Sequence, residues 1–212
     1  MHDTRLLATK LVSTPYDLSL KLHYIEFDIF QDITQYRRLI RRLIYLTTTR
    51  PDIAFVVQQL SQHVSQPRVV HYRAAIRILQ YVKSFSAKGL FYEHKTDLSL
   101  SGFADSDWAS CPTTRQYVTG YTIFLGSSLV SWKSKKQSTV SRSSCEAEYR
   151  TLAALTYEVQ WLHTLFTELN IKFHKPTSLY CDNRSAVYLA HNPTFHECTK
   201  HIEIDSHLIV RK

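Results

Sequence analysis

The chain has 212 residues, enough for one or two domains, and its contents of 44% apolar and 21% charged residues are ordinary for a globular protein. No run approaches the ~18 apolar residues of a membrane span, no signal peptide is recognisable, and the scattered cysteines indicate no disulfide framework, so we expect an intracellular protein, cytoplasmic or nuclear and not secreted. The formal net charge is +8, of which residues 1–95 carry +7 (14 Lys+Arg minus 7 Asp+Glu), and this excess favours a nucleic-acid partner and no membrane.

The first half of the chain predicts three helices joined by short loops. Apolar residues recur at helical spacing over residues 34–46, 51–64 and 71–83. Pro51 suits the first turn of the second helix, because its missing N–H would have no partner inside the helix. The apolar stripe of the first helix consists of Tyr36, Leu39, Ile40, Leu43 and Ile44.

The opposite face of that first helix is basic, and it carries Arg37, Arg38, Arg41 and Arg42. Guanidinium groups so close together repel each other unless anions neutralise them, which a phosphate backbone would do. The alternative is a solvated face whose charge partners lie elsewhere in the chain. The four arginines are therefore candidate nucleic-acid-binding residues.

After a linker at residues 84–89 the hydrophobic period changes from helical to strand-like. We therefore expect a small basic helical unit over residues 1–88 and a second domain over residues 89–212. Ser143 and Glu146 have the spacing of a capping box at the start of a long helix. Strands are predicted at 98–105, 118–126, 128–136 and 178–181, and helices at 146–169, 183–192 and 197–211. This order predicts an α/β fold with a mixed sheet.

Three carboxylates stand at the ends of these elements. Asp105 ends the first predicted strand, Glu148 lies near the start of the long helix, and Asp182 follows the last strand. Two strand ends and a helix start can direct three carboxylates to one point, and hard oxygen ligands are what Mg²⁺ prefers. Asp107 shares a strand face with Asp105, so alternation does not decide between them. Glu146 is better explained by capping than by catalysis.

A separate tract near the end of the chain gathers four metal-binding residue types, His196, Cys198, His201 and His207. A zinc site there is one interpretation, but the spacing matches no standard zinc pattern. Solvent-facing side chains on a loop and a helix are the favoured interpretation.

Long stretches of the sequence resemble the polyproteins of copia-type retrotransposons. From about residue 98 to residue 212, the motifs GFADSDWA, RQYVTGYTIFLGSSLVSWKSKKQSTVSRSSCEAEYRTLA, LYCDNRSAVYLAHNP and KHIEIDSHLI resemble the ribonuclease H domain of this family. From about residue 13 to residue 93, STPYDLSLKL, YRRLIRRLIYLTTTRPDIAFVVQQLSQ and HYRAAIRILQYVK resemble the segment that follows the reverse-transcriptase palm. In the family that segment serves as thumb and connection and holds the template–primer duplex.

The resemblance implies a fold and an activity for each part. Residues 89–212 would form a ribonuclease H-like mixed sheet with flanking helices, and residues 1–88 a thumb- and connection-like helical segment. The catalytic and metal-binding residues would be Asp105, Glu148 and Asp182. These would hold two Mg²⁺ or Mn²⁺ ions and cleave the RNA strand of an RNA–DNA hybrid. The alternative is a remnant that binds the hybrid without cutting it; no small-molecule substrate is implied, and the oligomeric state stays open.

Two departures from the family pattern bear on these expectations. The YxDD-type polymerase motif is absent, so we expect no polymerase activity. The family continues beyond the position of Lys212 with a strand and a helix, whose ADxxTK-like motif supplies a fourth carboxylate. We therefore expect a C-terminally truncated domain without its final strand and helix. Glu203 and Asp205 are candidate substitute carboxylates, although no geometric reason favours them.

Overall fold

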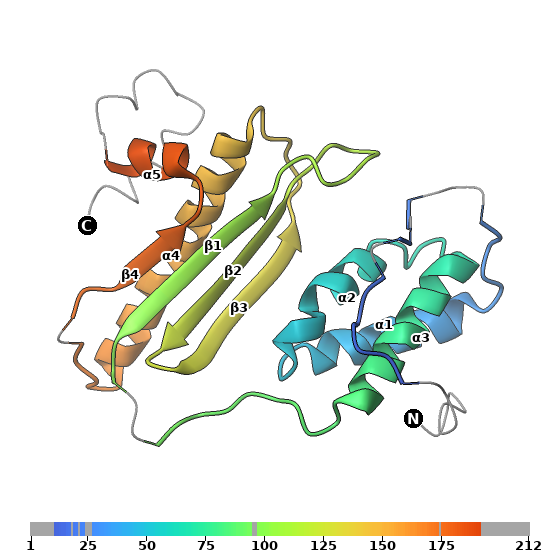
Figure 1. Cartoon of the computed structure of the whole chain (residues 1–212), viewed down its shortest axis with the longest axis horizontal. Helices are drawn as coiled ribbons and strands as arrows, with labels where there is room; N and C mark the ends of the chain where they lie inside the picture. The colour runs from blue at the N-terminus through green and yellow to red at the C-terminus, as the bar shows by residue number, and fades with distance from the viewer. Residues whose placement is uncertain are drawn as a thin grey trace. The chain divides into compact units, whose positions relative to one another are not determined.

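A computed structural model describes residues 11–17, 19–20, 22–23, 27–94, 97–173 and 175–191. The chain divides into two compact units, Met1–Leu90 and Phe91–Lys212 (Figure 1). The predicted final helix at 197–211 lies outside the described residues, as do the candidate zinc tract and the candidate substitute carboxylates Glu203 and Asp205.

The first unit is built from the three predicted helices. They are α1 (Ile33–Leu46), α2 (Ala54–Ser61) and α3 (Val69–Ser84), and a 3₁₀ turn, η3 (Pro51–Ile53), precedes α2. Proline does open the second helical segment as predicted, but its first turn is 3₁₀ and the α-helix begins only at Ala54. The three helices enclose a continuous apolar core.

The core face of α1 follows the predicted stripe with one exception. Tyr36, Leu39, Ile40 and Leu43 are buried, but Ile44 is 48% exposed, so its assignment to the core was wrong. Eight residues at about 100° each place Ile44 ~80° away from Tyr36 around the helix axis, at the margin of the stripe. The hydroxyl of Tyr36 donates to the carbonyl oxygen of Leu60 at 2.9 Å, which ties α1 to α2.

The four arginines of α1 are all exposed, as their position opposite the stripe predicted. The Arg37 Nε–H donates to the Val64 carbonyl oxygen at 2.9 Å, so this guanidinium also holds the segment after α2. Arg38, Arg41 and Arg42 lie on the same exposed side of α1 as Arg37. We call the surface formed by these four arginines the arginine face.

A buried histidine joins α3 to the N-terminal segment. The Arg68 N–H donates to His71 Nδ1 at 3.0 Å, so the ring proton is on Nε2, which donates to the Leu22 carbonyl oxygen at 2.8 Å. Both ring nitrogens are therefore satisfied in the neutral form, and protonation would put a second N–H against a donor. Burial lowers the pKa of His71, and the charge of Arg68 adds to this effect.

This arrangement predicts that acid destabilises the first unit. The pKa of His71 is lower in the folded chain than its ordinary value of 6.5, which we take for the unfolded chain. The contribution of neutral His71 to the free energy of unfolding is therefore complete above pH 6.5. It decreases as the pH falls from 6.5 toward the lower pKa of the folded chain. Urea unfolding at pH 7.5 and 5.5 should show this loss for the parent chain and a smaller loss for His71→Gln. The control His94→Gln removes an exposed imidazole and should behave as the parent does. Equal losses in the parent and His71→Gln would contradict the prediction.

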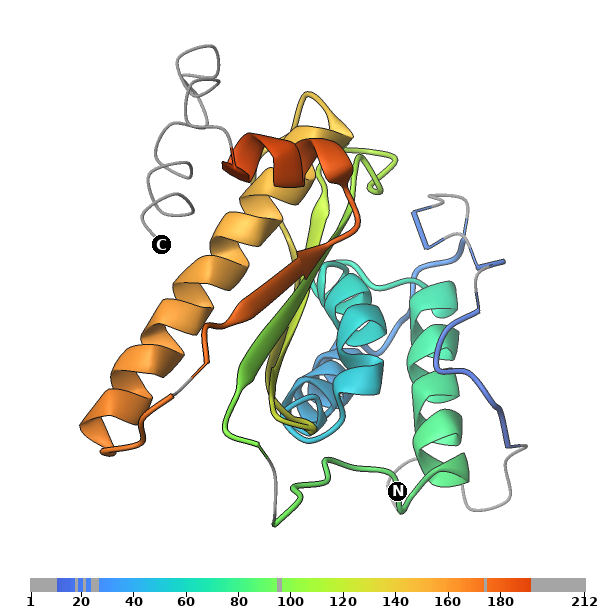
Figure 2. The same ribbon diagram turned by 60° about the vertical axis from the view of Figure 1, so that its left-hand side comes forward.

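The second unit is a sheet with a long helix across one face (Figure 2). Its elements in chain order are β1 (Leu100–Asp107), β2 (Val118–Leu125), β3 (Ser128–Lys136), α4 (Ser144–Glu168), β4 (Ser178–Cys181) and α5 (Arg184–His191). The strand order is β3-β2-β1-β4, in which β1 and β4 are parallel and the other neighbours antiparallel. The predicted α/β fold with a mixed sheet is confirmed for the described part of the chain. None of the helices described is long and apolar enough to cross a bilayer.

Helix α4 packs closely on the two central strands. Leu155 of α4 is fully buried against Leu100 and Ile123, which belong to the same apolar cluster. Gly102 of β1 permits the close approach, because a Cβ atom at that position would lie 2.8 Å from Leu155 Cδ1. The contact fixes the height of α4 on the sheet, and with it the position of the side chains in its first turns.

Candidate metal centre

Three elements of the second unit meet at one edge of the sheet. Strands β1 and β4 are parallel, with Ala104 opposite Cys181, so their carboxyl ends lie at the same edge. Helix α4 begins at that edge and runs back along the sheet (Figure 1). The ends of parallel strands beside a helix start are where ligands gather in open α/β sheets.

The start of α4 is fixed by side-chain caps. Ser143 Oγ accepts a hydrogen bond from the Glu146 N–H at 3.1 Å, as the sequence predicted. Glu146 Oε2 accepts from the N–H of Arg142 at 2.7 Å, one residue earlier than in an ideal capping box, and Glu146 Oε1 pairs with Arg150 at 2.9 Å. Capping and this ion pair account for the buried Glu146 carboxylate.

Glu148 is the carboxylate at the centre of the edge, and only 5% of it is exposed. Its Oε1 accepts the N–H of Ser106 in β1 at 3.0 Å, and its Oε2 lies 3.7 Å from Cys181 Sγ in β4. Burial, together with the charges of Asp105 and Asp182, raises the pKa of Glu148 to about 7, although the hydrogen bond from the Ser106 N–H acts in the opposite direction. Like charges so arranged disfavour ionisation, and a bound divalent cation would favour it.

Among the described residues, Glu148, Cys181 and Asp182 form a group whose ligand atoms all lie within 4.8 Å of one another. Sequence reasoning missed Cys181. Its signal was the alternation in β4, where Leu179 and Cys181 share the face that points to α4. Burial raises the pKa of the Cys181 thiol to about 11, so it is protonated at neutral pH and donates to Glu148.

The three members of this group suit different roles. Mg²⁺ takes oxygen ligands, whereas a thiol is a soft ligand that must lose its proton to bind metal. Glu148 and Asp182 can therefore supply oxygens to a hard divalent cation, and Cys181 orients Glu148. The Asp182 side chain follows directly after β4 and is exposed, so a ligand can reach it from solvent.

Asp105 lies beside this group but outside the 4.8 Å set. It is exposed on β1, on the same face as Phe103 and Asp107, as alternation predicted. The charge of Asp105 contributes to the raised pKa of Glu148. The pKa of Asp107 is also raised, mainly because this side chain is partly desolvated and to a smaller extent because of the charge of Asp105. The structure thus brings Glu148 and Asp182 together and places Asp105 within electrostatic reach of Glu148.

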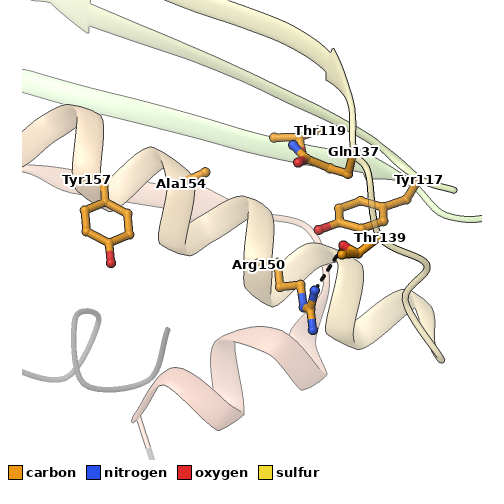
Figure 3. A pocket seen from close by; sticks show the side chains of 7 residues that line it. All are labelled: Tyr117, Thr119, Gln137, Thr139, Arg150, Ala154 and Tyr157. Carbon is orange, nitrogen blue, oxygen red and sulfur yellow. Dashed lines mark hydrogen bonds between the residues drawn. The ribbon is translucent and has the colours of Figure 1, made fainter. Parts of the chain in front are cut away.

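A shallow pocket of about 230 Å³ is lined by residues at the start of β2, residues just after β3 and residues of α4 (Figure 3). Arg150 in its wall donates to Thr139 Oγ1 at 3.2 Å and pairs with Glu146. Because a carboxylate already neutralises this guanidinium, the pocket has no evident preference for an anion, and it contains none of the three candidate metal ligands.

Comparison with known proteins establishes the family. The chain is 42% identical over 206 residues to the retrovirus-related Pol polyprotein from transposon RE1 of Arabidopsis thaliana, which covers 97% of this chain. It is also 42% identical over 208 residues to the polyprotein from transposon RE2 of the same plant. The chain belongs to the retrovirus-related Pol polyproteins of copia-type transposons.

This Pol segment spans 14% of the length of each of those two relatives. A shorter relative, Secreted RxLR effector protein 161 of Plasmopara viticola, is 40% identical over 128 residues, which make up 90% of that protein. No protein-family model and no solved structure matches the chain.

Proposed function

We propose that residues 89–212 form a ribonuclease H-like domain that cleaves the RNA strand of RNA–DNA hybrids within a retrotransposon Pol polyprotein. The observation that carries the proposal is the meeting of Glu148 and Asp182 at the carboxyl edge of β1 and β4, with the charge of Asp105 acting on Glu148. The sheet order β3-β2-β1-β4 and the helix α4 across it are compatible with such a fold.

In this function Asp105, Glu148 and Asp182 would hold Mg²⁺ or Mn²⁺, with two ions when the site is complete. Bound ions would supply an activated water and stabilise the leaving 3′ oxygen. The protein keeps Glu148 in place through the Ser106 N–H and the Cys181 thiol, and the side chain is buried away from bulk water. Asp105 and Asp182 are both exposed, so a nucleic acid can reach their carboxylates from solvent.

The first unit, over residues 1–88, is proposed as the thumb- and connection-like segment that holds the hybrid. Its arginine face offers exposed guanidinium groups for phosphates, which bind in a salt-dependent and sequence-independent manner. RNA would be distinguished from DNA by its 2′-hydroxyl groups and the A-like shape of the hybrid. This substrate places the proposed activity inside a cell, in the cytoplasm or the nucleus.

A second candidate function is hybrid binding without cleavage. The observation that favours it is the composition of the tight ligand group, in which a protonated thiol, Cys181, stands beside only two carboxylates. Mg²⁺ demands near-ideal octahedral oxygen coordination, so fewer carboxylates hold a second ion less well.

Labelled RNA–DNA hybrid separates the two functions. The purified chain is incubated with hybrid in Mg²⁺, in Mn²⁺ and in EDTA, and binding is measured in parallel by fluorescence anisotropy. Cleavage of the RNA strand that EDTA abolishes supports the ribonuclease. Tight binding without cleavage in either metal supports the binding remnant, and neither binding nor cleavage would overturn both.

Salt dependence tests the arginine face. Each bound phosphate adds about 0.9 to the slope of log affinity against log salt on double-stranded DNA, so Arg38→Gln with Arg41→Gln should flatten the slope by roughly one unit for each phosphate that the variant no longer binds. The control Lys172→Gln removes an exposed cation of the second unit and should change the slope less. The slope comes from anisotropy titrations at several salt concentrations. An unchanged slope in the double variant would mean that the arginine face is merely solvated.

A further inference from the structure

The loop between β1 and β2 buries a cysteine against a lysine. Cys111 is 5% exposed, and Lys136, the last residue of β3, donates from Nζ to Cys111 Sγ at 2.9 Å. The loop is closed around Cys111 by backbone hydrogen bonds, from the Arg115 N–H to the Cys111 carbonyl oxygen at 2.8 Å and from the Cys111 N–H to the Gln116 carbonyl oxygen at 3.3 Å. The positive φ of 54° at Arg115 completes the turn.

The surroundings of Cys111 favour the thiolate. Burial alone would raise the pKa of the Cys111 thiol, but hydrogen bonds from Lys136, Thr114 and Thr113 outweigh it and lower the pKa to about 7. The other two cysteines among the described residues differ, since burial raises the pKa of both Cys145 and Cys181. The thiolate is the reactive form of cysteine, so Cys111 is chemically distinct from its neighbours in the second unit.

We propose that Cys111 and Lys136 are a peroxide-responsive pair that closes into a covalent sulfur–nitrogen link. In the first step the Cys111 thiolate attacks one oxygen of hydrogen peroxide. The S–O bond forms as the O–O bond breaks, sulfur loses two electrons to the peroxide, and the departing hydroxide takes a proton from the Lys136 ammonium to become water. The products are a sulfenic acid on Cys111 and a neutral amine on Lys136.

In the second step the Lys136 amine attacks the sulfenyl sulfur. The S–N bond forms, the S–O bond breaks, and the hydroxide that leaves combines with the proton lost by nitrogen. The sum is one thiolate, one ammonium and one hydrogen peroxide converted to one sulfenamide and two water molecules, with no further oxidant. Sulfenic acids condense with nearby nitrogen in this way, and the 2.9 Å contact supplies the nitrogen without rearrangement of the backbone.

Burial of Cys111 favours the link over other outcomes. A thiolate in a closed loop is reached by a water-sized peroxide more readily than by a bulky thiol, so condensation with Lys136 competes well against capture by another cysteine. The link would join the β1–β2 loop to the end of β3. This loop continues directly from the strand that carries Asp105 and Asp107, but the proposal does not depend on a nuclease activity.

Peptide mass spectrometry tests the pair in the intact chain. The folded protein is treated with hydrogen peroxide, digested with chymotrypsin without reductant, and searched for a peptide joining Cys111 to Lys136 that has lost two hydrogen atoms. The parent should form it, and dithiothreitol should remove it. Lys136→Arg keeps the positive charge but offers a guanidinium, which is a poor nucleophile, so it should yield oxidised Cys111 without the link.

A matched control and a rate measurement complete the test. Lys135→Arg makes the same change one residue away at an exposed position and should retain the link. Lys136→Met removes the cation and should slow Cys111 oxidation at about pH 7 by roughly fivefold or more, since raising a thiol pKa of about 7 by one unit lowers the thiolate fraction from about one half to about one tenth. Circular dichroism checks that each variant is folded. The proposal is overturned if the parent gains only oxygen atoms at Cys111, or if all cysteines, including Cys198 on its own peptide, react equally fast.

Discussion

Replacing Glu148 by Gln should reduce metal-dependent cleavage of the hybrid by more than about a hundredfold, because even outer groups around a metal cost 10–100-fold when removed. Glutamine keeps the length of the side chain, and its oxygen can still accept the Ser106 N–H that now bonds to Glu148 at 3.0 Å. It removes the negative charge that a cation needs. We therefore expect a lower turnover number and a weaker Mn²⁺ affinity, the latter measured by isothermal titration calorimetry. The melting temperature should stay nearly the same or rise.

A second glutamate on the same helix provides the control. Glu158 accepts hydrogen bonds from Tyr121 at 3.2 Å and Ser131 at 2.9 Å, far along α4 from the candidate metal centre. Glu158→Gln should leave Mn²⁺ affinity unchanged and affect cleavage only through stability. If Glu148→Gln binds Mn²⁺ and cleaves as the parent does, then the edge of β1 and β4 is not the metal centre.

Truncation of Leu155 to Ala should cost the second unit about 2–5 kcal/mol of unfolding free energy, the usual range for a fully buried leucine. Leu155 has no exposed surface and fills the space that Gly102 leaves open between β1 and α4. Removing its methyl groups leaves a cavity that the neighbouring strand and helix cannot close without moving. The expected fall in melting temperature is on the order of 10 °C.

Leu169 provides a matched leucine-to-alanine control at the end of α4, where it is 59% exposed. Leu169→Ala should change the unfolding free energy by less than about 0.5 kcal/mol. Calorimetry or urea unfolding of both variants gives the comparison. A loss at Leu155 no larger than the loss at Leu169 would show that α4 does not depend on this contact.

Sequence patterns predicted the second unit best where local signals were strong. Strand β3 has the predicted bounds, because Gly126 with its positive φ of 58° sets the hairpin that starts it. The start of α4 follows from the Ser143 cap. Strand β1 extends two residues beyond the predicted end at Asp105, because Asp107 finds a partner in Val118, and such a pairing depends on residues remote in the sequence.

The candidate site was predictable in part for the same reason. Glu148 shares helical spacing with Leu152 and Leu155, which indicates a position on or near the sheet-facing side of the helix, and the structure buries it. The contact of Cys181 with Glu148 was not predictable, because it depends on the register between β4 and β1 and on the height of α4. In the first unit the helical pattern overestimated the buried surface. Ile44 fits the apolar stripe of α1 but is 48% exposed, because it lies past the edge of the surface that the other helices cover.

The parallel pairing of β1 with β4 has a consequence for the order of folding during synthesis. Strands β1, β2 and β3 are consecutive in the sequence and are joined by the loop at 108–117 and the turn at 126–127, so they can pair as soon as Lys136 has left the ribosome. Asp105 and Asp182 are 77 positions apart (182 − 105), and α4 lies between β3 and β4 in the sequence, so the whole of α4 is synthesised before β4 can pair with β1. Asp105 and Asp182 therefore come together late in synthesis, and a nascent chain lacks the candidate metal centre until β4 is in place.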